Sequence, residues 1–357
     1  MAISVFLGLS GGVDSAVAAL LLKQRGYDVT AVFMKNWEED DEEEDYCAAA
    51  ADLAVAEKVA ELLDIPLLTV NFATEYWDRV FEHFLQEYQA GRTPNPDILC
   101  NREIKFKAFL DYALAQGADK IATGHYADVH QCHGSTYLGK ASDQNKDQTY
   151  FLYAIGQHAL EHSLFPLATL GKAEVRELAR KHNLPNYNRK DSTGICFIGE
   201  RRFREFLSRY LPAKPGVIKK LGGEVIGEHQ GLMYYTIGQR HGLGIGGPGE
   251  PWFVVSKDLE DNVLFVVEGK NHPALYHSSL VAEELHWISG TSPAPLSCTA
   301  RIRHRQDEQK CHLSELTHNQ IRVDFEEPQR AIAPGQSVVI YNGDLCLGGG
   351  VISKAVG

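Results

Sequence analysis

Two cysteines lie in stretches whose composition could hold a thiol within reach of a ligand. Cys100 ends the proline-rich string TPNPDILC, and Cys196 lies in a second stretch that is rich in glycine and polar residues. We interpret residues 91–101 and 186–199 as long loops, which in compact domains are usually functional or disordered. A pair of thiols on two loops suits a sulfur relay: one thiol carries a persulfide, the other attacks it, and a disulfide remains.

The residues around Cys100 suggest how its thiol could become reactive. Residues 101–110 are helix-forming, so we expect Cys100 at a helix N-terminus, where backbone N–H groups would stabilise a thiolate. Asp97 is the nearby carboxylate best placed by sequence to move protons at a bound substrate. The alternatives are a buried structural thiol for Cys100 and a helix-capping role for Asp97.

A third candidate is the string Ser-Gly-Gly-Val-Asp-Ser at residues 10–15. It lies between an apolar run, residues 3–9, and a helix-forming stretch, residues 16–23. Glycines at such a junction let the backbone approach a ligand, and N–H groups at a helix N-terminus bind anions. It is not a Walker loop, because no Gly-Lys-Ser/Thr follows, and it does not match the dinucleotide fingerprint either. We interpret it as a phosphate-binding loop, with a tight turn whose Ser and Asp cap the helix as the alternative.

Alternating strand and helix patterns place these candidates in an α/β domain. We expect strands at residues 3–9, 28–34, 66–70 and 120–123, and helices at residues 16–23, 48–63, 75–89 and 104–116. This alternation predicts a doubly wound, Rossmann-like parallel sheet. The two long loops would then lie at the carboxyl edge of the sheet, where ligands bind in such folds.

The sequence changes character after residue 200. Residues 219–249 are rich in glycine, with a strand-like piece at residues 233–237, which indicates a small central module. Short β-branched runs at residues 298–303, 320–325, 337–341 and 350–353 predict a β-barrel or sandwich. We therefore expect domains at residues 1–200, 201–278 and 279–357.

The composition of the 357 residues is that of a folded protein, with 44% hydrophobic and 23% charged residues. Seven cysteines at irregular spacing fit neither a disulfide framework nor a closed zinc site, so we assign no metal ligand. No apolar run approaches the roughly 18 residues of a membrane helix, and the first residues show no secretory signal. We expect a cytoplasmic protein.

The net charge of −12 does not exclude a polyanionic partner. The acidic run at residues 38–45 supplies eight of the negative charges, whereas residues 201–220 hold seven basic residues against one acid. A second basic cluster contains Arg301, Arg303, His304 and Arg305. Nucleic-acid binding and an ordinary solvated surface both fit these clusters.

Four strings in order carry a resemblance to a known family. They are SGGVDS (residues 10–15), TPNPDILCN (93–101), DSTGICFIGE (191–200) and YTIGQRHG (235–242). The first resembles the signature of the PP-loop ATP pyrophosphatases, and the four together are similar to the bacterial tRNA-specific 2-thiouridylases. The likeness extends from residue 3 to the Leu-Gly-Gly-Gly string at residues 347–350, and it implies a PP-loop α/β domain, a small central module and a C-terminal β-barrel.

The resemblance implies ATP-dependent 2-thiolation of uridine in tRNA, at the wobble position. Enzymes of the superfamily cleave ATP between the α and β phosphates, so the base oxygen would be adenylated, with Mg²⁺ escorting the pyrophosphate. Cys100 would be the nucleophile and Cys196 the persulfide carrier, loaded by a persulfide sulfur donor protein. Neither a membrane nor DNA is implied as a partner.

The resemblance also implies sets of binding residues. The nucleotide contacts would be Gly8, Leu9, Ser10, Gly11, Gly12, Val13, Asp14, Ser15, Met34 and Gly124. The RNA contacts would be Asn95, Pro96, Asp97, His125, Lys146, Asp147, Gln148, Arg303, His304 and Gln336. Basic and amide side chains are what contacts with phosphates and base edges require, and a solvated surface is the alternative for each position.

Two other functions account for part of these observations. A PP-loop synthetase or amidating ligase would use the same adenylation on a small molecule, but it would not need Cys100 and Cys196. A tRNA-binding protein without catalysis would not need an intact string at residues 10–15. Pyrophosphate release that depends on added tRNA would separate the three.

Overall fold

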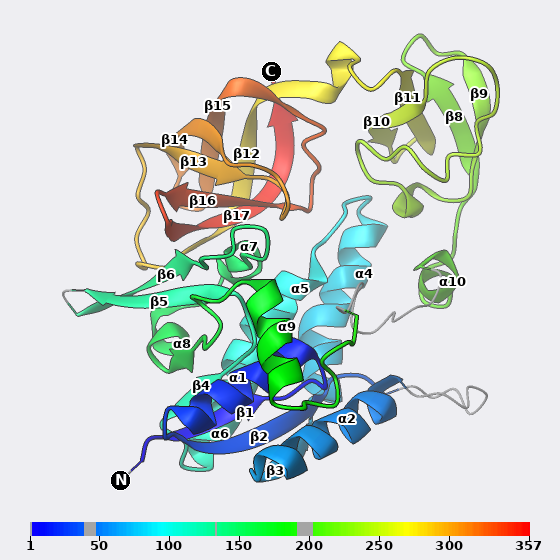
Figure 1. The fold of residues 1–357 in the computed structure, drawn as a ribbon. Coiled ribbons are helices and arrows are strands. Elements are labelled where there is room, and N and C mark those ends of the chain that lie inside the picture. The colour runs from blue at the N-terminus through cyan, green and yellow to red at the C-terminus, as the bar shows by residue number, and fades with distance from the viewer. Residues whose placement is uncertain (1, 39–47, 133, 191–202) are drawn as a thin grey trace.

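The structure, a computed structural model, describes residues 2–38, 48–132, 134–190 and 203–357. Figure 1 shows three parts: an α/β domain that carries the N-terminus, a small β module, and a β-barrel that carries the C-terminus. The fold class predicted from the sequence, a doubly wound parallel sheet with a central module and a C-terminal barrel, is confirmed. In the described ranges no helix is both long enough and apolar enough to cross a membrane.

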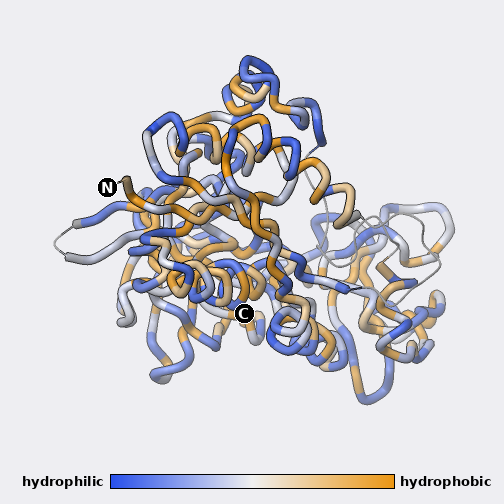
Figure 2. Tube along the Cα trace, turned by 90° about the horizontal axis from the view of Figure 1, so that it is seen from below, coloured by the Kyte–Doolittle hydropathy of each residue, from blue (hydrophilic) through white to orange (hydrophobic). Residues whose placement is uncertain are grey.

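Five parallel strands form the centre of the α/β domain. They are β1 (Ser4–Gly8), β2 (Asp28–Lys35), β3 (Leu67–Asn71), β4 (Lys120–Ala122) and β7 (Ser163–Leu164), in the order β3-β2-β1-β4-β7. Strand β1 is apolar and buried from its second residue onward, because both of its faces are covered. Val5 and Leu7 pack into one hydrophobic core, and Phe6 packs into another on the opposite face. Figure 2 shows these hydrophobic stretches running through the interior, with hydrophilic segments around them.

Helices cover both faces of this sheet. On one face α1 (Val13–Gln24) packs against α2 (Ala48–Leu63) and α9 (Lys172–Lys181). Two longer helical runs follow β3: α3 (Ala73–Tyr76), η1 (Trp77–Phe81) and α4 (Glu82–Gln89), then α5 (Pro96–Leu99), η2 (Cys100–Ala108) and α6 (Phe109–Ala115). The segments η1 and η2 are π-helical, a rare geometry that is often found at functional sites.

The sheet has its topological switch point between β1 and β4. Strand β1 pairs with β2 on one side and with β4 on the other, all parallel. Because the chain leaves neighbouring strands in opposite directions at such a point, a crevice opens at their carboxyl ends. The loops after β1 and β4 flank this crevice, and they contain residues 10–15 and Gly124.

The C-terminal barrel is antiparallel. Its strands are β12 (Tyr276–Trp287), β13 (Leu296–Arg301), β14 (Gln309–Thr317), β15 (Gln320–Arg330), β16 (Ser337–Asn342) and β17 (Leu345–Val356), and the pairing of β12 with β17 closes it. A hairpin of the α/β domain, β5 (Ala127–Cys132) and β6 (Ser135–Lys140), extends this sheet through β17. The barrel is therefore joined to the α/β domain by strand pairing as well as by side chains.

The central module contains a four-stranded sheet in the order β10-β11-β8-β9. Its strands are β8 (Gly216–Lys220), β9 (Val225–His229), β10 (Trp252–Asp258) and β11 (Val263–Glu268), and helix α10 (Phe203–Ser208) precedes them. The strand expected at residues 233–237 is wrong. Residues Leu232–Tyr234 form a 3-10 turn, η3, and the adjacent side chains of Tyr234 and Tyr235 are both buried, whereas a half-buried strand would alternate.

Candidate functional site

The phosphate loop joins β1 to α1 at the switch point. Gly11 has a φ of +76°, and a β-carbon there would lie 2.6 Å from the Asp52 carbonyl oxygen, so this position requires glycine. Ser15 Oγ donates to Gly12 O at 3.0 Å and accepts from the Ser10 N–H at 3.3 Å, which fixes the turn. In the described chain no side chain caps α1, whose N-cap is Gly12. The first-turn N–H groups are therefore suited to an anion.

Three more of the predicted nucleotide contacts surround this loop. A β-carbon on Gly8 would lie 2.9 Å from Met34 Cε, and one on Gly124 would lie 2.7 Å from the Ser15 backbone nitrogen. The absence of side chains at both glycines thus lets Met34 and the loop after β4 close on the end of β1. The structure brings these residues together, and their contact with a nucleotide stays a prediction.

A lysine that the sequence analysis missed lies beside the loop. Lys172, the first residue of α9, places Nζ 2.7 Å from both carboxylate oxygens of Asp14. The Tyr126 hydroxyl donates to the same carboxylate at 2.9 Å. The Lys172 side chain is 13% exposed, so its charge is partly shielded from water and acts strongly on the loop. An ammonium at this position suits phosphate oxygens.

The segment that leads to Cys196 is attached to the phosphate loop. Asn186 Nδ2 donates to Gly11 O at 2.9 Å, and Arg189 Nη1 donates to the same oxygen at 3.3 Å. Arg189 also forms an ion pair with Asp52 on α2. Cys196 itself lies outside the described residues, which end at residue 190 on this side. The segment before it therefore approaches the loop that is predicted to hold ATP.

The helix that carries Cys100 begins earlier than expected. Asn95 is the N-cap, its Oδ1 accepts from the Asp97 N–H at 3.2 Å, and Pro96 occupies the first helical position. The expectation that Cys100 lies at a helix N-terminus is therefore wrong. Cys100 lies beyond the first turn, where the helix dipole acts more weakly on a thiolate. Its side chain is 3% exposed.

Asp97 and His125 lie in partly dehydrated surroundings. Burial raises the pKa of Asp97, and the nearby positive charges of Lys105 and His304 oppose this shift. Burial, and then the charge of Lys105, hold the pKa of His125 well below its ordinary value, so its ring is neutral near pH 7. His125 Nδ1 lies 2.8 Å from Thr123 Oγ1.

The loop before Asp97 is where the three parts of the molecule meet. The Thr93 N–H donates to Pro334 O at 3.1 Å, and Gln336 Nε2 donates to Thr93 O at 2.7 Å. Thr93 Oγ1 lies 3.1 Å from Thr236 Oγ1 in the central module. The structure thus brings Gln336 and the string at residues 235–242 to the string at residues 93–101.

The other predicted RNA contacts gather at the junction with the barrel. The carboxylate of Asp147, 1% exposed, accepts from Arg301 Nη1 at 3.0 Å and from Thr149 Oγ1 at 2.8 Å. His304 Nε2 donates to Asp147 O at 3.1 Å, and Gln148 Oε1 accepts from the Tyr126 N–H at 2.9 Å. Lys146 is half-buried and Arg303 is exposed. The carboxylate of Asp147 is thus held inside the junction, and the RNA contacts of this group stay predictions.

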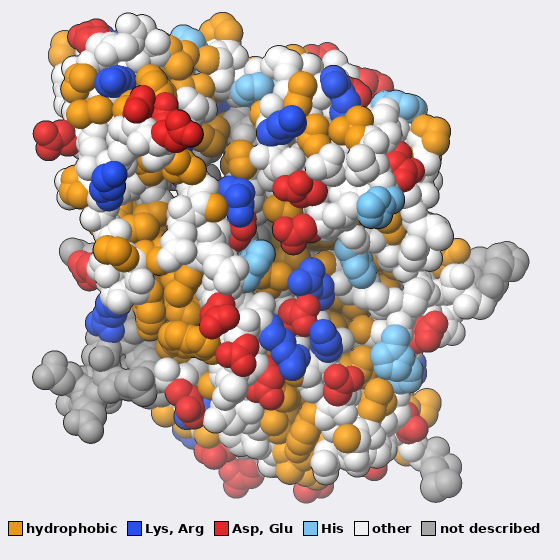
Figure 3. Space-filling view, turned by 180° about the vertical axis from the view of Figure 1, so that it is seen from behind, with side chains coloured by type: hydrophobic (Ala, Val, Ile, Leu, Met, Phe, Trp, Pro, Cys, Tyr) orange, Lys and Arg blue, Asp and Glu red, His pale blue; other side chains and the backbone are white. Residues whose placement is uncertain are grey.

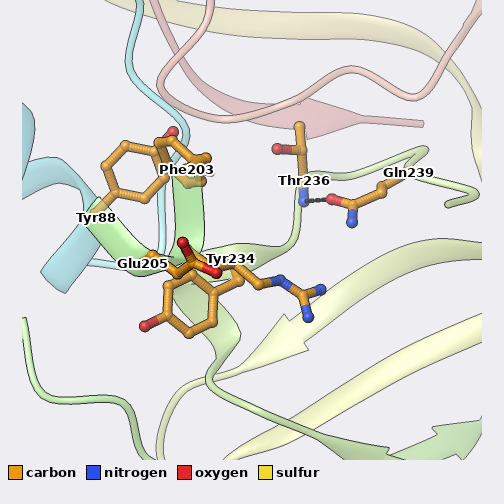
Figure 4. Close-up of a pocket in the computed structure, with 7 residues that line it drawn as sticks. Tyr88, Phe203, Glu205, Tyr234, Thr236 and Gln239 are labelled. Carbon is orange, nitrogen blue, oxygen red and sulfur yellow. Dashed lines mark hydrogen bonds between the residues drawn. The ribbon is translucent and has the colours of Figure 1, made fainter. Parts of the chain in front are cut away.

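A hollow of about 630 Å³ lies between α4, α10 and the central module (Figure 4). It is lined by Tyr88, Phe203, Arg204, Glu205, Tyr234, Thr236 and Gln239. The Thr236 N–H donates to Gln239 Oε1 at 2.9 Å, as the dashed line shows, and the Arg204 guanidinium lies 5.7 Å from the Tyr234 ring centre. Because Thr236 also contacts Thr93, this hollow adjoins the loop that precedes the Cys100 helix.

Comparisons with known proteins cover the whole chain. Family models described as tRNA methyl transferase HUP domain, tRNA methyl transferase PRC-barrel domain and aminomethyltransferase beta-barrel domain match residues 3–200, 204–268 and 277–352. Curated relatives named tRNA-specific 2-thiouridylase MnmA include those of Nitrosomonas eutropha, 60% identical over 99% of both chains, and of Nitrosomonas europaea, 61% identical over 98% of this chain and 97% of that one. The relative from Francisella tularensis is 58% identical over 98% of both.

These matches confirm the resemblance that the four strings indicated. They extend over nearly the full length of each relative, so no large part of this chain lacks a counterpart. The identity is far above the level at which a shared fold alone would be the conclusion. The chain belongs to the family of tRNA-specific 2-thiouridylases, with an N-terminal domain of the HUP class.

Proposed function

We propose that this protein uses ATP to convert uridine to 2-thiouridine in tRNA, at the wobble position. One observation carries the proposal. Gly124 touches the phosphate loop, with its β-carbon position 2.7 Å from Ser15 N, and the next residue, His125, packs against Phe106 with ring centres 5.8 Å apart. Phe106 lies on the same helix as Cys100 and Asp97. The phosphate loop and the helix that carries Cys100 therefore contact adjacent residues of the same loop, Gly124 and His125. This arrangement suits adenylation followed by sulfur transfer.

The first step needs a proton acceptor and a phosphate cradle. ATP supplies the adenylyl group: O2 of uracil bonds to the α-phosphorus, pyrophosphate leaves, and N3 of the base loses its proton. Asp97 takes that proton, because burial raises the pKa of its carboxyl and makes it a better base. The N–H groups of residues 10–15 and the ammonium of Lys172 hold the phosphates.

The second step transfers sulfur. The terminal sulfur of a persulfide on Cys196 bonds to C2 of the base, and AMP leaves with the former base oxygen. The Cys100 thiolate then attacks the Cys196 sulfur, the S–S bond to the base breaks, and thiouridine departs. A disulfide between Cys100 and Cys196 remains for an external thiol to reduce. A sulfur donor protein that carries a persulfide reloads Cys196.

A magnesium ion is part of this proposal. Mg²⁺ usually binds through one or two carboxylates together with substrate phosphates and water, rather than in a cage of protein ligands. The described residues hold no group of three His, Cys, Asp or Glu side chains that could form such a cage. Asp14, the carboxylate within the phosphate loop, would suit the first kind of site once the Lys172 ammonium, which contacts both of its oxygens, turned to the phosphates. The ion would neutralise charge on the pyrophosphate as it leaves.

The remaining parts position the RNA. We assign catalysis to residues 1–200. We assign contacts with RNA to residues 201–278 and 279–357, in addition to those made by residues 1–200. The target base must leave its stack to reach the buried Cys100, as in other enzymes that act on a base. On the face that Figure 3 shows, Lys and Arg side chains are mixed with acidic ones, which on this face favours several local contacts with RNA over one broad basic patch.

The experiment that tests this function is pyrophosphate release with and without tRNA. When ATP, Mg²⁺ and unmodified tRNA are all present, the purified protein should release pyrophosphate. Release should be much slower when any one of these components is left out. Equal release without tRNA would favour a small-molecule synthetase or ligase instead. The words methyl transferase in the family models imply another chemistry, and the phosphate loop together with the cysteine pair favours thiolation over it.

A further inference from the structure

Three arginines of the barrel line one hollow of about 480 Å³, a size within the usual range of ligand sites. They are Arg303 and Arg305, in the turn after β13, and Arg330 at the end of β15. The rest of the lining consists of Tyr276, Ile302, Gln306, Gln309, Glu327, Pro328 and Gln329. The hollow therefore presents three guanidinium groups and one carboxylate on a protein whose net charge is −12.

The charges of these arginines are not neutralised by the chain. In the described part of the protein none of the three forms an ion pair with a carboxylate, although Glu327 lies in the same lining. Arg303 Nη2 donates to Ala331 O at 2.5 Å, and Arg330 Nε donates to Lys270 O at 3.1 Å. These carbonyl contacts orient the two guanidinium groups and leave most of their N–H donors available.

The side-chain amides in the lining of the hollow are hydrogen-bonded to one another. Gln306 Nε2 donates to Gln329 Oε1 at 2.7 Å, and Gln329 Nε2 donates to Gln309 Oε1 at 3.2 Å. This chain of hydrogen bonds uses the amides on one another and stiffens the wall. Most of the donors that remain for an incoming group are those of the arginines, beside the hydroxyl of Tyr276.

Arg303 and Arg330 are close enough to repel each other. Arg303 is exposed as a whole residue, but the lining of the hollow shields its guanidinium group from water, and this shielding, followed by the positive charge of Arg330, lowers the pKa of Arg303. The Arg330 guanidinium is also held 4.8 Å from the ring centre of Phe253 in the central module, so it cannot turn away without losing this cation–π contact. An anion between the two guanidinium groups would relieve the repulsion.

The cluster adjoins the proposed site. A β-carbon on Gly238, in the string at residues 235–242, would lie 3.6 Å from Arg303 Nη2 and 3.9 Å from Arg330 Nη1. His304, next to Arg303, donates to Asp147 O and faces Asp97 closely enough to influence its charge. An RNA strand whose target base lies at Asp97 and Cys100 would thus run past this hollow.

We propose that Arg303 and Arg330 together bind one backbone phosphate of the RNA, and that Arg305 adds charge at the rim of the same hollow. The proposal rests on the proposed function, since it takes RNA as the substrate. Guanidinium groups suit this role because their planar donors match phosphate oxygens in pairs. Arg330 and Arg305 thereby join the RNA contacts, from which the sequence analysis had omitted them.

The test is tRNA binding by the full chain across a range of salt concentrations, with Arg330→Gln, Arg303→Gln and the double variant. Arg330→Gln should weaken binding about 10-fold and lower the salt slope by about one unit. Because both arginines hold the same phosphate, the double variant should lose less than the sum of the two single losses. Lys310→Gln removes an exposed charge on β14 that does not line the hollow, and it should bind as the parent does.

The outcomes separate this proposal from the proposed function. Arg330→Lys, which keeps the charge but not the planar fork, should keep the parent salt slope and bind more weakly than the parent. A parent protein that thiolates tRNA while Arg330→Gln keeps both affinity and slope would overturn the phosphate site alone. Strictly additive losses in the double variant would show that the two arginines do not share a phosphate. A parent that does not bind tRNA would overturn the proposed function along with it.

Discussion

The side-chain amide of Gln336 donates a hydrogen bond of 2.7 Å to the carbonyl oxygen of Thr93, which ties the barrel to the loop before Cys100. The Thr93 N–H donates in the other direction to Pro334 O. Gly335 has a φ of +89°, and a β-carbon there would lie 2.8 Å from Thr93 N, so the two segments can approach this closely because residue 335 is glycine. Gln336 therefore has a role in the protein itself, besides the RNA contact predicted for it.

Replacing Gln336 should loosen this loop before any RNA binds. In Gln336→Ala we expect hydrogen exchange at the Thr93 amide to be about fivefold faster, since a neutral hydrogen bond contributes about 1 kcal/mol. Exchange measured by mass spectrometry on the RNA-free protein checks this. Gln320→Ala, which removes an amide that contacts Glu283 within the barrel, is the control and should leave Thr93 unchanged. Unaltered exchange in Gln336→Ala would show that the contact does not hold the loop.

Asp14→Ala and Ser15→Ala should each lower ATP use by about 100-fold or more, because they remove groups at the phosphate cradle. Asp14→Ala also leaves the partly buried ammonium of Lys172 without its carboxylate. Binding of tRNA should be unchanged. Pyrophosphate release in the presence of tRNA is the measurement. Asp28→Ala is the control, because Asp28 is exposed and begins β2, at the end of the sheet opposite the phosphate loop. Parent-like release in either loop variant would refute the assignment of residues 10–15.

Thiolation should depend on pH through Asp97. The ionised carboxylate is the base, so the rate should fall as the pH drops through the pKa of Asp97, which burial raises. Lys105 stabilises the ionised form, and Lys105→Gln should therefore raise this pKa and move the acidic limb of the rate profile to higher pH. Lys107→Gln, whose amine pairs with Glu103 at 2.9 Å, should leave the limb in place. Identical profiles in the two variants would exclude Asp97 as the titrating base.

Asp147 should matter for stability. Asp147→Ala removes one of the two carboxylates that contact Arg301, also buried, and leaves Glu308 as the other, so we expect a loss of about 1–3 kcal/mol in the free energy of unfolding. Thermal and denaturant unfolding of the RNA-free protein measure this loss. Asp344→Ala removes an exposed carboxylate nearby on the barrel and should have little effect. A variant of Asp147 that is as stable as the parent but binds tRNA poorly would make this residue an RNA contact instead.

The local parts of the site could be predicted from the sequence because their signals are contiguous. The phosphate loop lies between one strand and one helix, and the six residues 10–15 contain both of its glycines and the start of the helix. The start of the Cys100 helix was missed although its signal was present: Asn95 before Pro96 is a usual N-cap and first helical residue. The strand expected at residues 233–237 failed because Gly231 and Gly238, with φ of +146° and +83°, turn the chain on either side of it.

The parts contributed by distant segments could not be predicted in this way. Lys172 is 158 residues from Asp14 in sequence, and it follows a glycine in a stretch that resembles any amphipathic helix start. The pairing of Gln336 with Thr93 spans 243 residues. Arg330 comes near Arg303 because β15 and the turn after β13 meet at one end of the barrel. The spacing of apolar residues in a sequence indicates whether one segment is a helix or a strand. These contacts depend instead on how several helices and strands pack together.

Mass spectrometry of tRNA nucleosides, after a single turnover with ATP and a sulfur source and without added reductant, is the most direct test of sulfur transfer through Cys100 and Cys196. The parent should form 2-thiouridine, and peptide mapping of the same sample should find a disulfide between Cys100 and Cys196. Cys100→Ser and Cys196→Ser should bind ATP and tRNA yet form none, while Cys346→Ser, which removes a buried thiol of the barrel, should remain active. Full activity in Cys196→Ser, or a disulfide with a different cysteine, would contradict the relay, and a parent that forms no 2-thiouridine would contradict the proposed function itself.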